Sequence, residues 1–92
     1  MTAPTSVLDR AWEVSPRVSI RPESFGALLY HFGTRRLSFL KDRRLLDVVQ
    51  RLSDCPTARQ ACLAAGLATH ELPTYALALS KLADTDMLQE RL

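Results

Sequence analysis

The chain has few of the residues from which a catalytic or metal centre is built. Its 92 residues include only two cysteines and two histidines, whereas a structural zinc site needs four closely arranged ligands. Cys55 and Cys62 form no Cys-x-x-Cys pair and are expected to be small buried thiols. Asp84 and Asp86 supply too few oxygen ligands for a hard cation. These patterns assemble neither a catalytic site nor a metal site.

Long hydrophobic runs and a strong net charge are also lacking. No apolar run approaches the roughly 20 residues of a membrane-spanning helix, and the N-terminus lacks the pattern of a signal peptide, so a cytoplasmic location is expected. The net charge is only +2, with basic and acidic residues interspersed. This balance gives little attraction to nucleic acid or to a membrane. The length predicts one domain.

The N-terminal half has the alternating pattern of β-strands. Residues 1–11 are expected to be a flexible N-terminal tail, and residues 12–92 a single domain. Apolar residues alternate from Trp12 to Ile20, with Pro16 as an interruption, which predicts a bent or broken edge strand. Two apolar runs, 26–32 and 36–40, then flank a short glycine-containing connection, as in a β-hairpin. The first of these arms is apolar at nearly every position, so both of its faces are expected to be covered.

After Lys41 the apolar period changes to that of helices. Asp42 can cap a first helix, Thr57 can cap a short second helix, and Gly66 can end it. A third helix is expected to contain Pro73 in its first turn. Its buried stripe is predicted to be Leu72, Tyr75, Leu79 and Leu82, with Leu77 on the far side. The fold class is therefore α+β: a winged-helix-like domain with a three-stranded antiparallel sheet followed by three helices.

The last two helices form a helix-turn-helix order, which makes a winged-helix DNA-binding regulator one alternative. A recognition helix needs several basic or amide side chains that face the major groove. The third helix has only Lys81, with no Arg, Asn or Gln between Glu71 and Ala83. A small dimerising structural module is a second alternative from a different class.

The second hairpin arm is the candidate binding element. Two basic pairs, Arg35-Arg36 and Arg43-Arg44, flank it. If the arm 36–40 is a free edge, cations at both ends would attract an acidic extended peptide, which could pair with the edge as an added strand. The alternatives are that the arginines belong to a solvated turn and a solvated helix start, and that a chain terminus or a second copy covers the edge.

The whole pattern resembles a known family. The order of strands, "GALLYHFGTRRLSFL", "LLDVVQRL", "ARQACLAAGL" and "ELPTYALALSKLADTDML" is similar to that of small peptide chaperones with a precursor-recognition element, such as the pyrroloquinoline quinone chaperone. The run from "RPESFG" onward resembles specifically the mycofactocin-system peptide chaperones. The resemblance covers roughly residues 12–88 and includes no catalytic signature.

The resemblance implies a protein that is not an enzyme and holds no cofactor. Its relatives bind the leader region of a ribosomal precursor peptide as an added β-strand, over a groove walled by the third helix. They deliver it to a radical S-adenosylmethionine (SAM) maturase, which in the mycofactocin system decarboxylates a C-terminal Val-Tyr end. The implied partners are thus a precursor peptide and a radical SAM maturase, with no nucleic acid and no membrane; a weak homodimer stays an alternative.

The resemblance also assigns candidate peptide-binding residues. The edge strand would offer mainly backbone groups, the helix would offer apolar contacts, and Arg35 or Arg36 would pair with leader carboxylates. The residues assigned by position are Arg35, Arg36, Leu37, Ser38, Phe39, Leu40, Tyr75, Ala78, Leu79 and Leu82. The sequence leaves open which strand residues face the groove, and whether Leu79 and Leu82 belong to the core.

Overall fold

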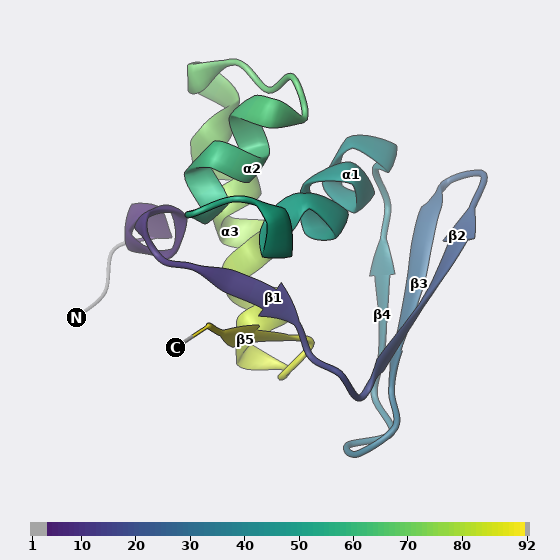
Figure 1. Cartoon of the computed structure of the whole chain (residues 1–92). Helices are drawn as coiled ribbons and strands as arrows, with labels where there is room; N and C mark the ends of the chain where they lie inside the picture. The colour runs from purple at the N-terminus through teal and green to yellow at the C-terminus, as the bar shows by residue number, and fades with distance from the viewer. Residues whose placement is uncertain (1–3, 92) are drawn as a thin grey trace.

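A three-stranded antiparallel sheet stands beside a layer of helices (Figure 1). The structure is a computed structural model and describes residues 4–91. The sheet contains β2 (Val18–Glu23), β3 (Gly26–His31) and β4 (Leu37–Leu40), in the order β2-β3-β4. One face of the sheet packs on α1 (Arg43–Arg51), which contacts β3 and β4.

The central strand β3 has one buried and one partly exposed face. Ala27, Leu29 and His31 are buried, whereas Leu28 and Tyr30, which alternate with them, are half-buried. The sequence-based prediction that both faces are covered is therefore wrong. Since no described element packs over Leu28 and Tyr30, the apolar composition of β3 leaves an apolar outer face on the sheet.

The sheet depends on particular residues at the start and the end of β3. Gly26 has φ +151°, and a Cβ atom there would lie 1.9 Å from the carbonyl oxygen of Leu40, so only glycine fits. In the β3–β4 connection the imidazole Nδ1 of His31 accepts hydrogen bonds from the backbone N–H groups of Gly33 and Thr34, each at 3.0 Å. His31 thus stabilises the turn that leads into β4.

Local signals in the sequence place the first two α-helices correctly. The Asp42 carboxylate accepts a hydrogen bond from the backbone N–H of Arg44 at 2.8 Å and caps α1, which a 3₁₀ turn, η2 (Leu52–Asp54), extends. The hydroxyl of Thr57 likewise caps α2 (Ala58–Ala64) by accepting from Gln60 N–H. The glycine that follows α2, Gly66, has φ +91°, as predicted.

The third helix supplies the largest wall of the core. A short 3₁₀ turn, η3 (Thr69–Glu71), leads into α3 (Leu72–Asp84), and Pro73 lies in the first turn. The predicted stripe is buried and packs with apolar residues of the other elements: Leu72, Tyr75, Leu79 and Leu82. The α+β class with three helices is confirmed, while the winged-helix label stays a prediction.

The N-terminal segment differs from its prediction. The expected edge strand is divided: β1 (Trp12–Val14) leaves the three-stranded sheet and pairs antiparallel with a C-terminal strand, β5 (Leu88–Glu90). The sequence pattern did not indicate β5. The buried residue Ser15 and the following Pro16 separate β1 from β2, and the N–H of Ser15 donates to the carbonyl of Met87 at 3.0 Å.

The tail expected over residues 1–11 also differs from the structure. A 3₁₀ helix, η1 (Pro4–Asp9), packs against α3 and buries Val7 and Leu8 in the core. Transfer of these two apolar side chains out of water lowers the free energy of the folded state. The indole N–H of Trp12 donates to the carbonyl of Val7 at 2.9 Å. Residues 1–3 of the predicted tail lie outside the described residues. The single domain over residues 12–92 stays a prediction.

Candidate functional site

The outer edge of β4 is open to an additional strand. Within residues 4–91, β4 pairs with β3 and with no other strand. The described C-terminal strand pairs with β1, so the alternative in which it covers the β4 edge does not apply. An unpaired edge presents backbone N–H and C=O groups to any extended segment that approaches it.

The register of the hairpin identifies the backbone groups on this edge. His31 and Arg36 form a hydrogen-bonded pair, with His31 N–H donating to the Arg36 carbonyl at 2.9 Å. Because hydrogen-bonded and non-bonded pairs alternate in an antiparallel ladder, the backbone of Ser38, opposite Leu29, faces β3. The backbone groups of Leu37 and Phe39 therefore point outward, to the free edge. Which backbone groups an added strand can reach therefore follows from the register of the hairpin.

Two adjoining hollows, of about 250 and 320 Å³, lie between this edge and the helices. Phe39, Leu45 and Ala78 border both of them, so they form one continuous groove. We call it the β4–α3 groove. The other lining residues come from β4, the segment that leads into α1, and α3 with the residue after it: Ser38, Leu40, Lys41, Asp42, Thr74, Tyr75, Lys81, Leu82 and Thr85.

The helical wall of the groove overlaps one side of the core stripe, because Tyr75 and Leu82 belong to both. Ala78 is half-buried and its small side chain leaves the space that the groove occupies. Leu79, the next residue, is 0% exposed and lines neither hollow. Because the directions of successive side chains on a helix differ by about 100°, Leu79 points into the core while Ala78 faces the groove.

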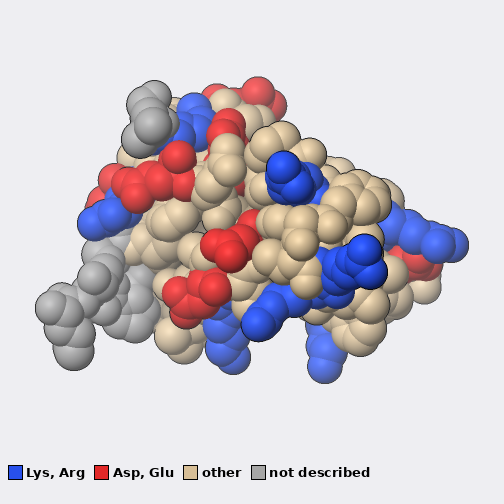
Figure 2. Space-filling model, turned by 90° about the horizontal axis from the view of Figure 1, so that it is seen from below, with Lys and Arg blue, Asp and Glu red and all other residues tan. Residues whose placement is uncertain are grey.

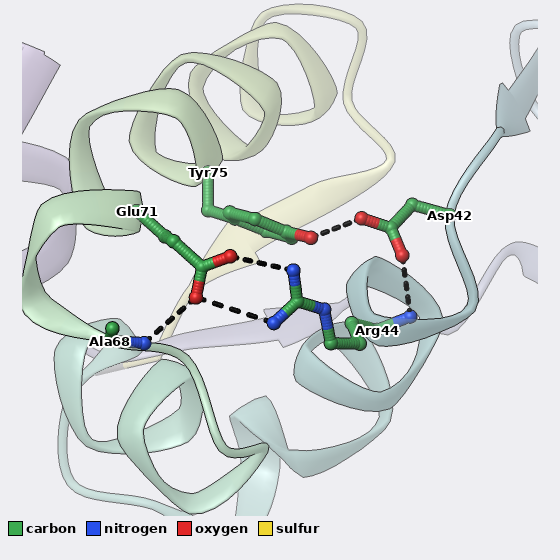
Figure 3. A network of polar contacts seen from close by, with 5 residues as sticks. All are labelled: Asp42, Arg44, Ala68, Glu71 and Tyr75. Carbon is green, nitrogen blue, oxygen red and sulfur yellow. Dashed lines mark hydrogen bonds and ion pairs between the residues drawn. The ribbon is translucent and has the colours of Figure 1, made fainter.

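A polar network joins the two helices at one end of the groove (Figure 3). The Tyr75 hydroxyl donates to Oδ2 of Asp42, the same residue that caps α1 through Oδ1. Arg44 lies over the Tyr75 ring, with its Cζ atom 5.9 Å from the ring centroid. Burial and the hydrogen bond to Asp42 raise the pKa of Tyr75. The ring therefore presents carbon atoms to the groove while its hydroxyl is held by the protein.

The same network includes a bidentate ion pair. The Arg44 guanidinium donates to the two Glu71 carboxylate oxygens at 2.6 and 3.3 Å. Glu71 also accepts from the backbone N–H of Ala68 at 2.9 Å. The hydrogen bond from Arg44, and then the one from Ala68, lower the pKa of Glu71. This pair links the start of α1 to the start of α3 and so stabilises the position of the groove wall.

The structure brings together six of the ten predicted site residues. The groove is lined by Ser38, Phe39, Leu40, Tyr75, Ala78 and Leu82. Leu79 belongs to the core, and Arg35, Arg36 and Leu37 are exposed beside or beyond the edge and do not line the groove. Their roles in peptide binding stay predictions.

Sequence reasoning missed part of the groove lining. Thr74 and Lys81 line the groove but were not among the predicted site residues, and their helical spacing from Ala78 was the available signal. Leu45 was not among the predicted site residues either, although it is buried and borders both hollows. Lys81 is also the only exposed cation on α3, which gives little support to duplex DNA recognition.

The groups considered for metal binding or catalysis lie apart from one another. Within the described residues, no three His, Cys, Asp or Glu side chains gather as a metal site. Cys55 and Cys62 are free thiols, and burial raises the pKa of Cys62 to about 11, which disfavours the reactive thiolate. No helix in residues 4–91 has the length and hydrophobicity to cross a lipid bilayer.

Comparison with known proteins identifies the family. The model of the peptide chaperone MftB family matches residues 11–89. The chain belongs to the peptide chaperone MftB family. This agrees with the resemblance inferred from the sequence, and the matched region contains β4, α3 and the whole β4–α3 groove.

Three relatives named peptide chaperone MftB are similar to the chain over most of its length. A peptide chaperone MftB of Mycobacterium tuberculosis is 55% identical over 83 residues, which cover 90% of this chain and 76% of the relative. That of Mycobacterium ulcerans is 56% identical over 87% of this chain and 73% of its own. That of Mycolicibacterium smegmatis is 51% identical over 87% of this chain and 78% of its own. No solved structure matches the chain.

Proposed function

We propose that the chain is a cytoplasmic, non-enzymatic chaperone for the leader region of a ribosomal precursor peptide in mycofactocin biosynthesis. The peptide binds as an added strand on β4 and is presented to a radical SAM maturase. The observation that carries this proposal is the open β4 edge beside an apolar groove. An added strand needs both features, since the edge supplies hydrogen bonds and the groove receives alternate side chains.

The details of the edge support this mode of binding. Leu37 and Phe39 offer outward N–H and C=O groups to the leader backbone. Leader side chains on one side of the added strand then enter the groove and contact Ala78, Tyr75 and Leu82. Arg35 and Arg36 are exposed and form no ion pair with a described residue, so they are available to leader carboxylates.

Calorimetric titration of the purified chain with the precursor peptide encoded beside it tests this function. We expect saturable one-to-one binding of the peptide and no binding of a duplex oligonucleotide of equal concentration. Binding of the duplex alone would support the DNA-binding alternative. Binding of neither, together with a dimer in sedimentation velocity, would mean that a second copy of the chain fills the β4 edge.

A further inference from the structure

The outer face of the three-stranded sheet carries most of the exposed large apolar side chains among the described residues. Six large apolar side chains are exposed among the described residues, and four of them gather here: Phe25 (49%), Phe32 (62%), Leu37 (57%) and Phe39 (59%). The half-buried Leu28 and Tyr30 lie between them, since their strand positions pair with Phe39 and Leu37. A contiguous patch of this kind marks an interaction surface.

Aromatic contacts hold this patch together. The Tyr30 and Phe32 rings meet edge to face with centroids 5.1 Å apart, and Phe25 meets Phe39 in the same way at 6.5 Å. Edge-to-face pairs restrict ring orientation, so the patch is preorganised for contact. We define Phe25, Leu28, Tyr30, Phe32, Leu37 and Phe39 as the outer patch.

Charges around the outer patch are mainly positive. Residues 17–41, which form the sheet and its connections, include five basic residues and one acidic residue. The acidic residue, Glu23, pairs with Arg21 at 2.9 Å, and the other four cations have no ion-pair partner among the described residues. In Figure 2 most of the blue surface lies on the right, the side of the three-stranded sheet, and most of the red lies on the left and near the centre.

We propose that the outer patch docks a folded protein whose surface has an apolar centre and an acidic rim. A flat aromatic patch buries well against another protein surface, and the basic rim requires acidic groups opposite it. A second copy of the chain would place one basic rim against another, which disfavours self-association here. This proposal rests on the proposed function, because the docked protein is the maturase that receives the peptide.

The position of the outer patch gives this docking a consequence for the peptide. Side chains of an added strand on β4 alternate between the groove and the outer face of the sheet, which bears Leu37. A protein docked on the outer patch therefore contacts one side of the bound leader directly. Binding of the peptide and of the docked protein should then favour each other, since each enlarges the surface that the other contacts.

A matched pair of double variants tests the proposal. Phe25→Ser with Phe32→Ser removes two exposed aromatic side chains that do not line the groove. Leu63→Ser with Leu77→Ser makes an equivalent change at the two exposed apolar positions on the helices. With the radical SAM maturase as analyte over the captured chain, we expect the first pair to weaken maturase binding by about tenfold or more. The control pair should leave it unchanged, and both should bind the precursor peptide normally.

A single charge reversal provides a second test that does not remove apolar surface. Arg21 is an exposed residue of the outer face, paired in the ladder with Leu28. Arg21→Glu should slow association of the maturase and weaken its dependence on salt, relative to Arg59→Glu on α2. Circular dichroism of each variant establishes that it is folded before binding is compared.

The outcomes separate this proposal from the proposed function. Normal maturase binding by the Phe25/Phe32 variant, or loss of binding only in the Leu63/Leu77 variant, would overturn the docking proposal while peptide binding stands. A wild-type dimer that dissociates in the Phe25/Phe32 variant would also overturn it and assign the patch to a second copy. Failure of the wild type to bind the precursor peptide would instead contradict the proposed function itself.

Discussion

Tyr75 and Asp42 connect α3 to the start of α1 through one carboxylate. The Tyr75 hydroxyl donates to Oδ2 of Asp42, and Oδ1 accepts from the backbone N–H of Arg44 at 2.8 Å. Asp42 therefore caps one helix while it holds the tyrosine of another. Both residues line the β4–α3 groove, so the contact that stabilises the helix also determines where the groove wall begins.

Tyr75→Phe should destabilise the domain by about 1 kcal/mol, because one oxygen of Asp42 loses its protein donor. The ring would stay in place, so peptide affinity should change little. Urea unfolding measures the free energy and calorimetry measures the affinity. Tyr30→Phe, on the other face of the sheet, is the matched control and should leave stability nearly unchanged. Equal losses in the two variants would mean that the Asp42 contact contributes nothing.

The carboxyl of Glu71 should titrate below its usual range, about 4.3. The hydrogen bonds from Arg44 and then from Ala68 N–H lower its pKa in the folded state. The ionised carboxylate therefore stabilises the fold fully at pH values above the pKa of the unfolded chain. This contribution is lost as the pH falls through the folded-state pKa, when Glu71 becomes protonated. Carboxyl-carbon NMR should show the Glu71 pKa rise in Arg44→Met and stay unchanged in Arg51→Met, whose arginine pairs with Asp47. An unchanged Glu71 pKa in Arg44→Met would contradict the assignment.

Proline substitutions on β4 should separate the open edge from the sheet ladder. Leu37→Pro removes an outward N–H at the first strand position, so the fold should tolerate it while peptide affinity falls by about tenfold. Ser38→Pro removes an N–H that faces β3 and should lower the melting temperature instead. Leu37→Ala controls for the lost side chain. If Leu37→Pro bound the peptide normally, the added strand would have to lie elsewhere.

Filling the groove should block the peptide without unfolding the domain. Ala78→Phe places a large ring where both hollows meet, so we expect peptide affinity to fall by more than about tenfold. Ala64→Phe makes the same change at an exposed position of α2 and serves as the matched control. Calorimetry compares the two, and similar affinities in both variants would exclude the groove as the binding site.

Charge reversal at Arg36 should act mainly on the association rate. Exposed cations beside the edge attract an acidic peptide before contact, so Arg36→Glu should slow association and reduce its dependence on salt. Arg59→Glu has the same charge change on α2 and should have a smaller effect. Stopped-flow fluorescence at several salt concentrations measures both. Identical kinetics in the two variants would assign Arg36 to a solvated turn.

The sequence alone determined the features that depend on neighbouring residues. The caps at Asp42 and Thr57 and the left-handed Gly66 follow from hydrogen bonds and backbone freedom within a few residues. The buried stripe from Leu72 to Leu82 follows from helical period. These local preferences were enough to place the helices and the hairpin.

Only the tertiary structure decided the features that depend on distant contacts. The pairing of Trp12 with Glu90 divides the first strand, and burial of Leu8 converts an expected tail into core. Local patterns cannot encode these results, because they depend on which surfaces meet after the chain has folded. For the same reason the sequence did not reveal which backbone groups of β4 face outward, that Ala78 rather than Leu79 lines the groove, or that one face of β3 stays uncovered.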